Sequence, residues 1–347
     1  MEELKNILLT EFDHEQGIYK HSTQEGYWSN LSVKDQKILF ENLKTKTTKE
    51  AILDLFPQFF DMIFDQSRAV GLRLLEIENN DIGIDYGCMW GNLLISAARQ
   101  CKAMVGVDQT SDSLRFTQLR LQEEGLDNCF LLNANLRSEL SFKETFNFAI
   151  LCGVLEWIPE NRIIDLKRHF AKSRMKFMTP EINPRTDQLN FLKSVNRNLK
   201  TDGRIYLAIE NRFDYRYFLG KKDPHSNQFF TAILPRFLSN ILSNIKYGRP
   251  YVNYIYSFRA LEDLLRDAGF ERCEVYASFP DYHFPKKIFP IGLGVKFDSY
   301  LGYHLVETND LYHHYALKIR RIADKVIFNK LKLLILAPAI IIIAYKK

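Results

Sequence analysis

One stretch of the chain, residues 82–94, combines an acid with two glycines in a pattern suited to binding a small molecule. It reads IGIDYGCMWGNLL: an apolar run leads to Asp85 and Gly87, and Gly91 opens a helical pattern. Glycine at a strand-to-helix turn lets the backbone approach a ligand closely, and the amino end of a helix favours negative charge. Three residues, CMW, separate the glycines, so the turn does not match the GxGxxG pattern of nicotinamide-binding folds.

Two acids narrow the choice of ligand. The carboxylate of Asp85, two residues before Gly87, would repel a diphosphate and attract a cation such as an amino-acid ammonium. Asp108 ends the next apolar run, MVGVD, where acids of dinucleotide-binding folds hold the ribose hydroxyls. S-adenosylmethionine carries both an ammonium and a ribose, so the pair favours this ligand. Two local alternatives stay open: Asp85 as a helix cap and Asp108 as a turn residue.

The elements that would position these acids alternate along the chain. Apolar runs typical of buried strands are followed by stretches with helical periodicity. The predicted strands are IGIDYG, MVGVD, CFLLNA, FNFAILCGV, GRIYLAIEN, ERCEVYAS and the terminal IIIIAYK. Buried strands that alternate with helices predict a parallel sheet covered on both faces, a doubly wound α/β fold that binds ligands at the carboxyl ends of its strands.

In order and spacing, these motifs resemble the class I S-adenosylmethionine-dependent methyltransferases. IDYGCMWGNLL is similar to their first motif, VGVD to the end of their second strand, FNFAILCGVLEWIP to their fourth strand, and LKTDGRIYLAIEN to their fifth strand. The resemblance covers residues 81–211 and, by order of elements, the sixth strand and the terminal run. It implies a seven-stranded Rossmann-like sheet whose last strand is antiparallel and lies beside the sixth.

Helical periodicity in the N-terminal part, together with the resemblance, predicts a division of the chain. Residues 1–76 would form a helical extension, in which Thr47 and Glu50 resemble a capping box. Residues 77–347 would form the methyltransferase domain, with insertions at about 159–188, 212–256 and 279–335 that build a substrate lid. Within the first insertion, the basic run at 162–176 is expected to be a solvated helix face.

Carried over residue by residue, the family pattern implies a cofactor site. Asp85, Gly87 and Gly91, with Cys88 between the glycines, would line the methionine end of the cofactor. Asp108 would bind the ribose, and Asn133 and Ala134 would flank the adenine. Cys152 and Gly153 would border the methyl group. Met89 departs from the family, because a glycine is common there. Its side chain must either turn outward or narrow the pocket.

A second group of residues leaves the fifth strand. The segment AIENRFDYRYFLGKKDPHS, with the later FPDYHFP, resembles methyltransferases of bacterial polysaccharide (O-antigen and capsule) biosynthesis, although Asp214 and Pro224 interrupt the usual pattern. The resemblance implies a carbohydrate acceptor. The substrate-binding candidates are Glu210, Asn211 and Arg212. The candidate general bases, needed to take the proton of a sugar hydroxyl, are His225, Asp281 and His283.

The expected function is therefore O-methylation of a sugar, glycan or glycolipid precursor. The alternative, which Met89 favours, is a non-catalytic subunit of the same fold that binds a partner in a biosynthetic complex. An oxidoreductase is disfavoured by Asp85 and by the glycine spacing. GVLEWI stands where base-methylating enzymes carry an NPPY-type tetrad, so no nucleic-acid partner is expected.

Composition sets the broad limits. The chain has 347 residues, a formal net charge of +5 and five cysteines without a CxxC pair, which predicts free thiols, a reducing cytoplasmic location and no metal site. The tail LKLLILAPAIIIIAYKK is interrupted by Pro338 and shorter than the about 20 residues of a membrane span, so it is expected to be a buried strand. The basic run before it leaves peripheral contact with the inner membrane face open.

Overall fold

The computed structural model describes residues 2–21, 31–140, 142–159, 183–291, 322, 325–331 and 333–347. The basic run at 162–176 and most of the expected lid at 279–335 lie outside these residues, as does the central part of the expected insertion at 159–188.

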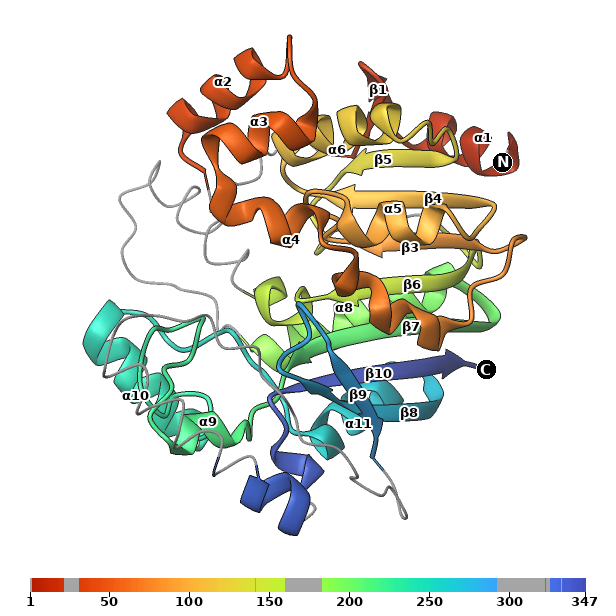
Figure 1. The fold of residues 1–347 in the computed structure, drawn as a ribbon. Helices are drawn as coiled ribbons and strands as arrows, with labels where there is room; N and C mark the ends of the chain where they lie inside the picture. Colours follow the sequence, from red (N-terminus) through yellow and green to blue (C-terminus); the bar gives the residue numbers. More distant parts are fainter. Residues whose placement is uncertain are drawn as a thin grey trace, which may run out of the picture.

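The described chain contains one mixed sheet of ten strands in the order β1-β2-β5-β4-β3-β6-β7-β10-β8-β9 (Figure 1). The strands are β1 (Asp13–Glu15), β2 (Ile18–Lys20), β3 (Ile82–Tyr86), β4 (Ala103–Asp108), β5 (Cys129–Asn133), β6 (Phe146–Cys152), β7 (Leu199–Glu210), β8 (Phe270–Phe279), β9 (Lys287–Pro290) and β10 (Ala339–Lys346). The expected α/β fold is confirmed, but the expected count of seven strands is wrong by three.

The three additional strands lie at the edges of the sheet. β1 and β2 form a short antiparallel hairpin that pairs with β5, and β9 pairs with β8. The N-terminal region is therefore not wholly helical as expected. The hairpin strands have three residues each, which is too short for alternation to register in the sequence.

The terminal apolar run is a strand inside the sheet, as predicted. β10 lies between β7 and β8 and runs antiparallel to both, with Ile340 opposite Ile209 and Ile341 opposite Tyr276. Residues 339–344 are buried on both faces. Among the described helices, none is long and apolar enough to cross a membrane.

Helices cover both faces of the sheet (Figure 1). One face packs against α5 (Asn92–Ala98), α6 (Ser111–Glu123) and the 3-10 segment η2 (Gln66–Leu75). The other packs against α1 (Glu2–Glu11), α8 (Pro184–Asn198) and α11 (Phe258–Asp267). The remaining helical segments are α2 (Val33–Asn42), α3 (Thr48–Leu55), η1 (Pro57–Phe59), α4 (Phe60–Phe64), η3 (Leu155–Trp157), α9 (Tyr215–Phe218), α10 (Arg236–Tyr247), η4 (Lys325–Lys330) and η5 (Leu334–Leu336).

The N-terminal helices build a separate apolar cluster over the β3–α5 turn. α2 and α3 each begin with a capping box, and the predicted box of Thr47 and Glu50 is confirmed. Behind these caps, side chains of the N-terminal helices pack with Trp90 and Phe116, whose rings are 5.0 Å apart edge to face. The extension is therefore packed directly on the turn that the sequence singles out.

Candidate active site

The turn after β3 has the tight geometry that its glycines predict. Gly87 and Gly91 both have φ of +77°, a backbone conformation that side chains disfavour. A Cβ on Gly87 would lie 2.7 Å from Val154, and one on Gly91 would lie 2.6 Å from Thr117. Both glycines are therefore required by backbone conformation and by neighbouring atoms.

Met89 occupies a glycine-like position without filling the turn. Its φ is +46°, in the left-handed region that favours glycine. Its N–H donates to Asp108 Oδ2 at 2.9 Å, and its carbonyl accepts from Thr117 Oγ1 at 2.9 Å. The side chain packs against the apolar cluster of the N-terminal helices. Met89 thus turns toward the N-terminal extension, which answers the question that the sequence left open.

Asp85 and Asp108 lie on the same face of the sheet. β3 and β4 are parallel with Asp85 beside Gly106, and Asp108 is two residues further on, so both side chains share one face. Asp85 is 3% exposed. Burial raises the pKa of Asp85 to about 7, and the nearby Asp108 adds to the rise.

Groups around the two acids partly compensate their charge. The Leu94 N–H, in the first turn of α5, opposes the rise in the pKa of Asp85. The carboxylate of Asp108 accepts from the N–H groups of Met89 and Thr110. Burial nevertheless raises the pKa of Asp108. Each acid is held by the backbone and keeps further acceptor capacity for a ligand.

The structure brings the other predicted cofactor residues to the same strand ends. Asn133 lies opposite Asp108, and its Nδ2 donates to the Asp108 carbonyl at 3.1 Å, as does the N–H of Ala134. Cys152 ends β6, and burial raises the pKa of its thiol to about 12. Cys88 is buried, and Gly153 has φ of +66°. The geometry and the donor set thus fit a ligand with an ammonium and a vicinal diol.

Arg68 is a site residue that the sequence reading missed. It comes from η2 and lies close enough to Asp85 and Cys152 to oppose the rise in both pKa values. Its Nη1 donates to the Met62 carbonyl at 3.3 Å, while its buried Nε has no hydrogen-bond partner among the described residues. The guanidinium also lies 5.8 Å from the Phe284 ring. Lying 17 positions before Asp85 in irregular sequence, it left no motif to find.

The predicted substrate residues Asn211 and Arg212 are used within the protein. Asn211 Nδ2 donates to the carbonyls of Ile335 and Ala337, both at 2.8 Å. Arg212 donates from Nε and Nη2 to the carbonyls of Ala232 and Leu234. Their observed contacts hold the insertion and the start of β10, and their role as substrate contacts stays a prediction.

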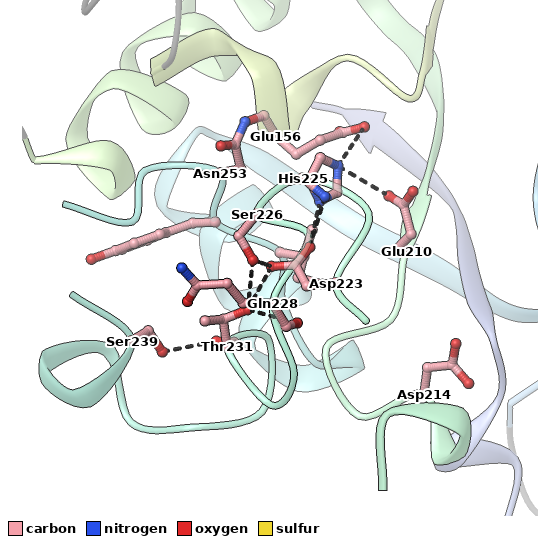
Figure 2. A network of polar contacts seen from close by, with 12 residues as sticks. Glu156, Glu210, Asp214, Asp223, His225, Ser226, Gln228, Thr231, Ser239 and Asn253 are labelled. Carbon is pink, nitrogen blue, oxygen red and sulfur yellow. Dashed lines mark hydrogen bonds and ion pairs between the residues drawn. The ribbon is translucent and has the colours of Figure 1, made fainter. Parts of the chain in front are cut away.

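His225 lies in a buried cluster of carboxylates (Figure 2). Its Nδ1 is 3.1 Å from Asp223 Oδ1, and its Nε2 is 3.9 Å from both Glu156 Oε1 and Glu210 Oε2. Burial lowers the pKa of His225, but Asp223, Glu156 and Glu210 raise it more, so that it lies well above its usual range. Burial and then Glu156 raise the pKa of Glu210.

Glu156 was also missed by the sequence reading. It belongs to η3, directly after β6, and is 0% exposed. Gln188 donates to the Leu155 carbonyl and Asn253 donates to the Glu156 carbonyl, which fixes this turn. Both carboxylate oxygens of Glu156 lack a hydrogen-bond partner among the described residues. An acid inside the apolar run GVLEWI, at the end of a predicted strand, was the available signal.

His283 and Asp281 approach the same strand ends from the loop after β8. Tyr282 donates to Glu210 Oε1 at 3.3 Å, and the His283 ring stacks on Tyr282 at 4.1 Å. Burial lowers the pKa of His283, which favours its neutral form. Asp281 Oδ1 accepts from the Phe284 N–H, so this carboxylate holds the turn. In the structure, Asp281 therefore holds the loop, whereas His283 lies against Tyr282 and favours its neutral form.

A cavity of about 160 Å³ lies beside His225. It is lined on one side by α10, through Ser243 and Tyr247, and on the other by residues 249–253, including Arg249. The Trp157 ring packs edge to face on the His225 ring, with the centroids 5.0 Å apart, and Trp157 is 43% exposed. The cavity joins polar side chains to the histidine, as a site for a small hydroxylated molecule would.

Comparison with known proteins finds similarity over part of the chain. Residues 84–173 match a family model described as a methyltransferase domain. This segment contains Asp85, Asp108, Cys152 and Glu156. The match covers the first strand-to-helix turn and the strand ends that carry the two acids.

Two curated relatives are similar over part of the chain. Both are described as probable cobalt-precorrin-6B C(15)-methyltransferases (decarboxylating). The protein from Methanocaldococcus jannaschii is 25% identical over 30% of this chain and 56% of its own length. The protein from Methanococcus maripaludis is 26% identical over 42% of this chain and 84% of its own length. The chain thus spans about half the length of the first relative.

Solved structures are similar over more of the chain but at lower identity. A Haemonchus contortus phosphoethanolamine N-methyltransferase 2 in complex with S-adenosyl-L-methionine is 13% identical, with a TM-score of 0.44, over 91% of this chain and 60% of that protein. The family match and the curated relatives thus show that residues 84–173, which carry the strand-end acids, are similar to a methyltransferase domain.

Proposed function

We propose that the protein is an S-adenosylmethionine-dependent O-methyltransferase that acts on a sugar of a glycan or glycolipid precursor. The observation that carries the methyltransferase assignment is the pair Asp85 and Asp108 on one face of the sheet, at neighbouring strand ends beside the glycine turn. S-adenosylmethionine supplies an electrophilic methyl group on a sulfonium centre.

The amino-acid end of the cofactor would be held by charges of both signs. Asp85 provides a carboxylate for the ammonium, and Arg68 provides a guanidinium for the carboxylate. The buried Nε of Arg68, which has no partner among the described residues, supports this role. Asp108 provides acceptors for the ribose hydroxyls, with Asn133 beside it. All four residues lie in or against the part of the sheet that the family resemblance assigns to the cofactor.

The acceptor half of the proposal depends on the insertion after β7. The polar cavity beside His225 suits a hydroxylated ring, and Arg249 suits an attached phosphate. α10 turns Ser239 and Ser243 inward, while Ile245 on its outer face is 79% exposed. An exposed apolar face next to a polar cavity supports an acceptor with both a sugar and a lipid.

The two histidines suggest which group accepts the proton of the acceptor hydroxyl. The environment raises the pKa of His225 and lowers that of His283, so the two rings favour different protonation states. Separated pKa values of this kind mark different roles in proton transfer. We assign proton acceptance to His283, which favours the neutral form, and orientation of the acceptor to the carboxylates around His225.

Met89 no longer favours a non-catalytic subunit, because its side chain packs on the N-terminal cluster and away from the turn. The precorrin substrate named for the curated relatives is not part of the proposal. Those matches cover 30% and 42% of this chain, and no described contact of the insertion points to a corrinoid.

Calorimetry with S-adenosylmethionine tests the cofactor half. Wild-type protein should bind, and Asp108→Ala should weaken binding by about 10- to 100-fold, the effect of losing hydrogen bonds to a charged group. Asp112→Ala, which removes a partly exposed acid of α6 paired with Arg115, is the matched control and should bind normally. Absence of binding by the wild type would contradict the proposal.

Labelled methyl transfer tests the acceptor half. Methyl-labelled S-adenosylmethionine is incubated with nucleotide sugars and with lipid-linked glycans, and products are separated by class. Label in the lipid-linked fraction is the expected result. Binding of the cofactor without transfer to either class would keep the methyltransferase assignment and overturn the carbohydrate acceptor.

A further inference from the structure

We propose that Glu156, Glu210 and His225 bind a divalent metal ion at the acceptor side of the site. One ligand atom from each residue can be chosen so that all three lie within 4.8 Å of one another. The three come from separate elements: η3, the end of β7 and the insertion after it. The lack of CxxC pairs, on which the expectation of no metal site depended, excludes only thiolate sites.

The strongest sign of a missing cation is Glu156. Its side chain is fully buried and points at His225 Nε2, while neither carboxylate oxygen accepts a hydrogen bond from a described residue. Glu210 Oε2, on the other side of the same nitrogen, also lacks a hydrogen-bond partner there. Buried carboxylates are normally hydrogen-bonded, paired or bound to metal.

His225 is oriented as a metal ligand would be. Asp223 is buried and accepts from the His225 backbone N–H and, at 3.1 Å, from Nδ1. Ser226 and Thr231 donate to its other oxygen and fix the carboxylate (Figure 2). Without the metal, the protonated ring is paired with the glutamates; when the ion displaces the Nε2 proton, Nδ1 keeps its proton and the lone pair of Nε2 is directed at the ion between the two glutamates. A carboxylate behind the ligating imidazole is the usual arrangement at metal sites.

The distances and the ligand set restrict the ion. Metal–ligand bonds of about 2.0–2.2 Å place adjacent ligand atoms about 2.8–3.8 Å apart. The two 3.9 Å separations from Nε2 lie just above this range, so the three side chains would close in slightly around the ion. Two carboxylates and one imidazole suit Mn²⁺ or a similar first-row cation better than Ca²⁺ or Cu⁺. Three protein ligands leave coordination positions for an acceptor oxygen and water.

The role of the ion rests on the proposed function. An acceptor hydroxyl bound to the ion has a lowered pKa and gives its proton to His283. The oxygen then forms a bond to the methyl carbon as the carbon–sulfur bond breaks, and the bonding pair stays on sulfur. The products are the methyl ether, S-adenosylhomocysteine and protonated His283, which returns its proton to solvent.

Manganese binding to the metal-stripped full-length chain tests the site directly. Paramagnetic resonance during Mn²⁺ titration should show one tight site per chain. Glu156→Gln and Glu210→Gln should each weaken binding by about tenfold or more. Glu139→Gln, which alters an exposed carboxylate paired with Arg197, should leave binding unchanged. Equal affinity of wild type and both site variants for Mn²⁺, Mg²⁺ and Zn²⁺ would overturn the proposal.

A second measurement does not depend on the folding of the glutamate variants. Electron spin echo spectra of Mn²⁺ bound to wild type should show coupling to one imidazole nitrogen, and His225→Gln should abolish it. Bound Mn²⁺ without nitrogen coupling would overturn the ligand set. S-adenosylmethionine binding, measured on the same samples, separates the two proposals: lost cofactor binding with intact metal binding contradicts the proposed function alone.

Discussion

At the scale of the residue, the site consists of buried acidic and basic side chains that lie close to one another. Asp85 and Asp108 are buried acids on one face of the sheet, and Arg68 approaches them from outside the region that resembles a known family. Glu156 and Glu210 form a second acidic group around His225. In the proposed function, the first group lies on the cofactor side of the strand ends and the second on the acceptor side.

The raised pKa of Asp85 predicts that cofactor affinity depends on pH. The ligand-free protein holds this pKa at about 7, so the carboxylate is increasingly protonated as pH falls below 7. The ammonium of the cofactor stays charged in this range. Affinity for S-adenosylmethionine should therefore fall by up to about tenfold per pH unit from about pH 7 to about pH 5.5. Calorimetry across this range measures it.

Asp85→Asn is the control for this titration. It should bind weakly at every pH and show little slope; a slope equal to that of wild type would assign the effect to another group. The contribution of Asp85 to the free energy of unfolding depends on pH in the opposite direction to cofactor affinity. Because the folded pKa lies above the ordinary value of an aspartate, ionised Asp85 opposes folding. The variant should gain more free energy of unfolding, relative to wild type, at pH 8 than at pH 4.

Arg68 is expected to recognise the carboxylate of the cofactor. Arg68→Gln should weaken binding of S-adenosylmethionine by about 10- to 100-fold, the effect of losing a charge-assisted hydrogen bond. Decarboxylated S-adenosylmethionine lacks the group that Arg68 would contact, so its affinity should be the same in wild type and variant. If both ligands lose equal affinity, Arg68 acts by holding η2 in place and does not contact the carboxylate.

At the scale of the element, the sequence could predict those features that depend on residues close together in the chain. The strand-to-helix turn was readable because glycine and acid spacing is local, and the C-terminal strand because isoleucine runs favour buried strands. The hairpin of β1 and β2 was not readable at three residues per strand. Glu156 and Met89 depend on tertiary neighbours: a loop that returns to η3, and the N-terminal cluster.

Gly91, in the turn after β3, and Gly125, directly after α6, offer a matched pair of glycine substitutions. Gly91 and Gly125 have φ of +77° and +65°, but a Cβ on Gly91 would meet Thr117, whereas a Cβ on Gly125 would meet nothing within 4 Å. Gly125→Ala should cost about 1 kcal/mol of unfolding free energy through backbone conformation alone. Gly91→Ala should cost about 1–3 kcal/mol more, because Thr117 must also move. Urea denaturation measures both; equal costs would show that α6 yields freely.

At the scale of the whole molecule, β10 is an inner strand of the sheet that lies next to the strand leading into the insertion that carries His225. It lies between β7 and β8, and its two faces contribute to both large cores. Asn211, at the end of β7, holds the segment before β10 through the carbonyls of Ile335 and Ala337. The last residues of the chain therefore support the strand end that presents Glu210.

Truncation of a β10 side chain should accordingly affect both stability and metal binding. Ile342 is fully buried, and Ile342→Ala should lower the free energy of unfolding by about 2–5 kcal/mol, as core truncations do. Ile335→Ala, at a position 54% exposed, should cost less than about 0.5 kcal/mol. Because β10 pairs with β7 up to Glu210, displacement of the strand should also weaken Mn²⁺ binding. A destabilised Ile342→Ala protein with wild-type Mn²⁺ affinity would show that Glu210 is positioned by β6 and Tyr282 without help from β10.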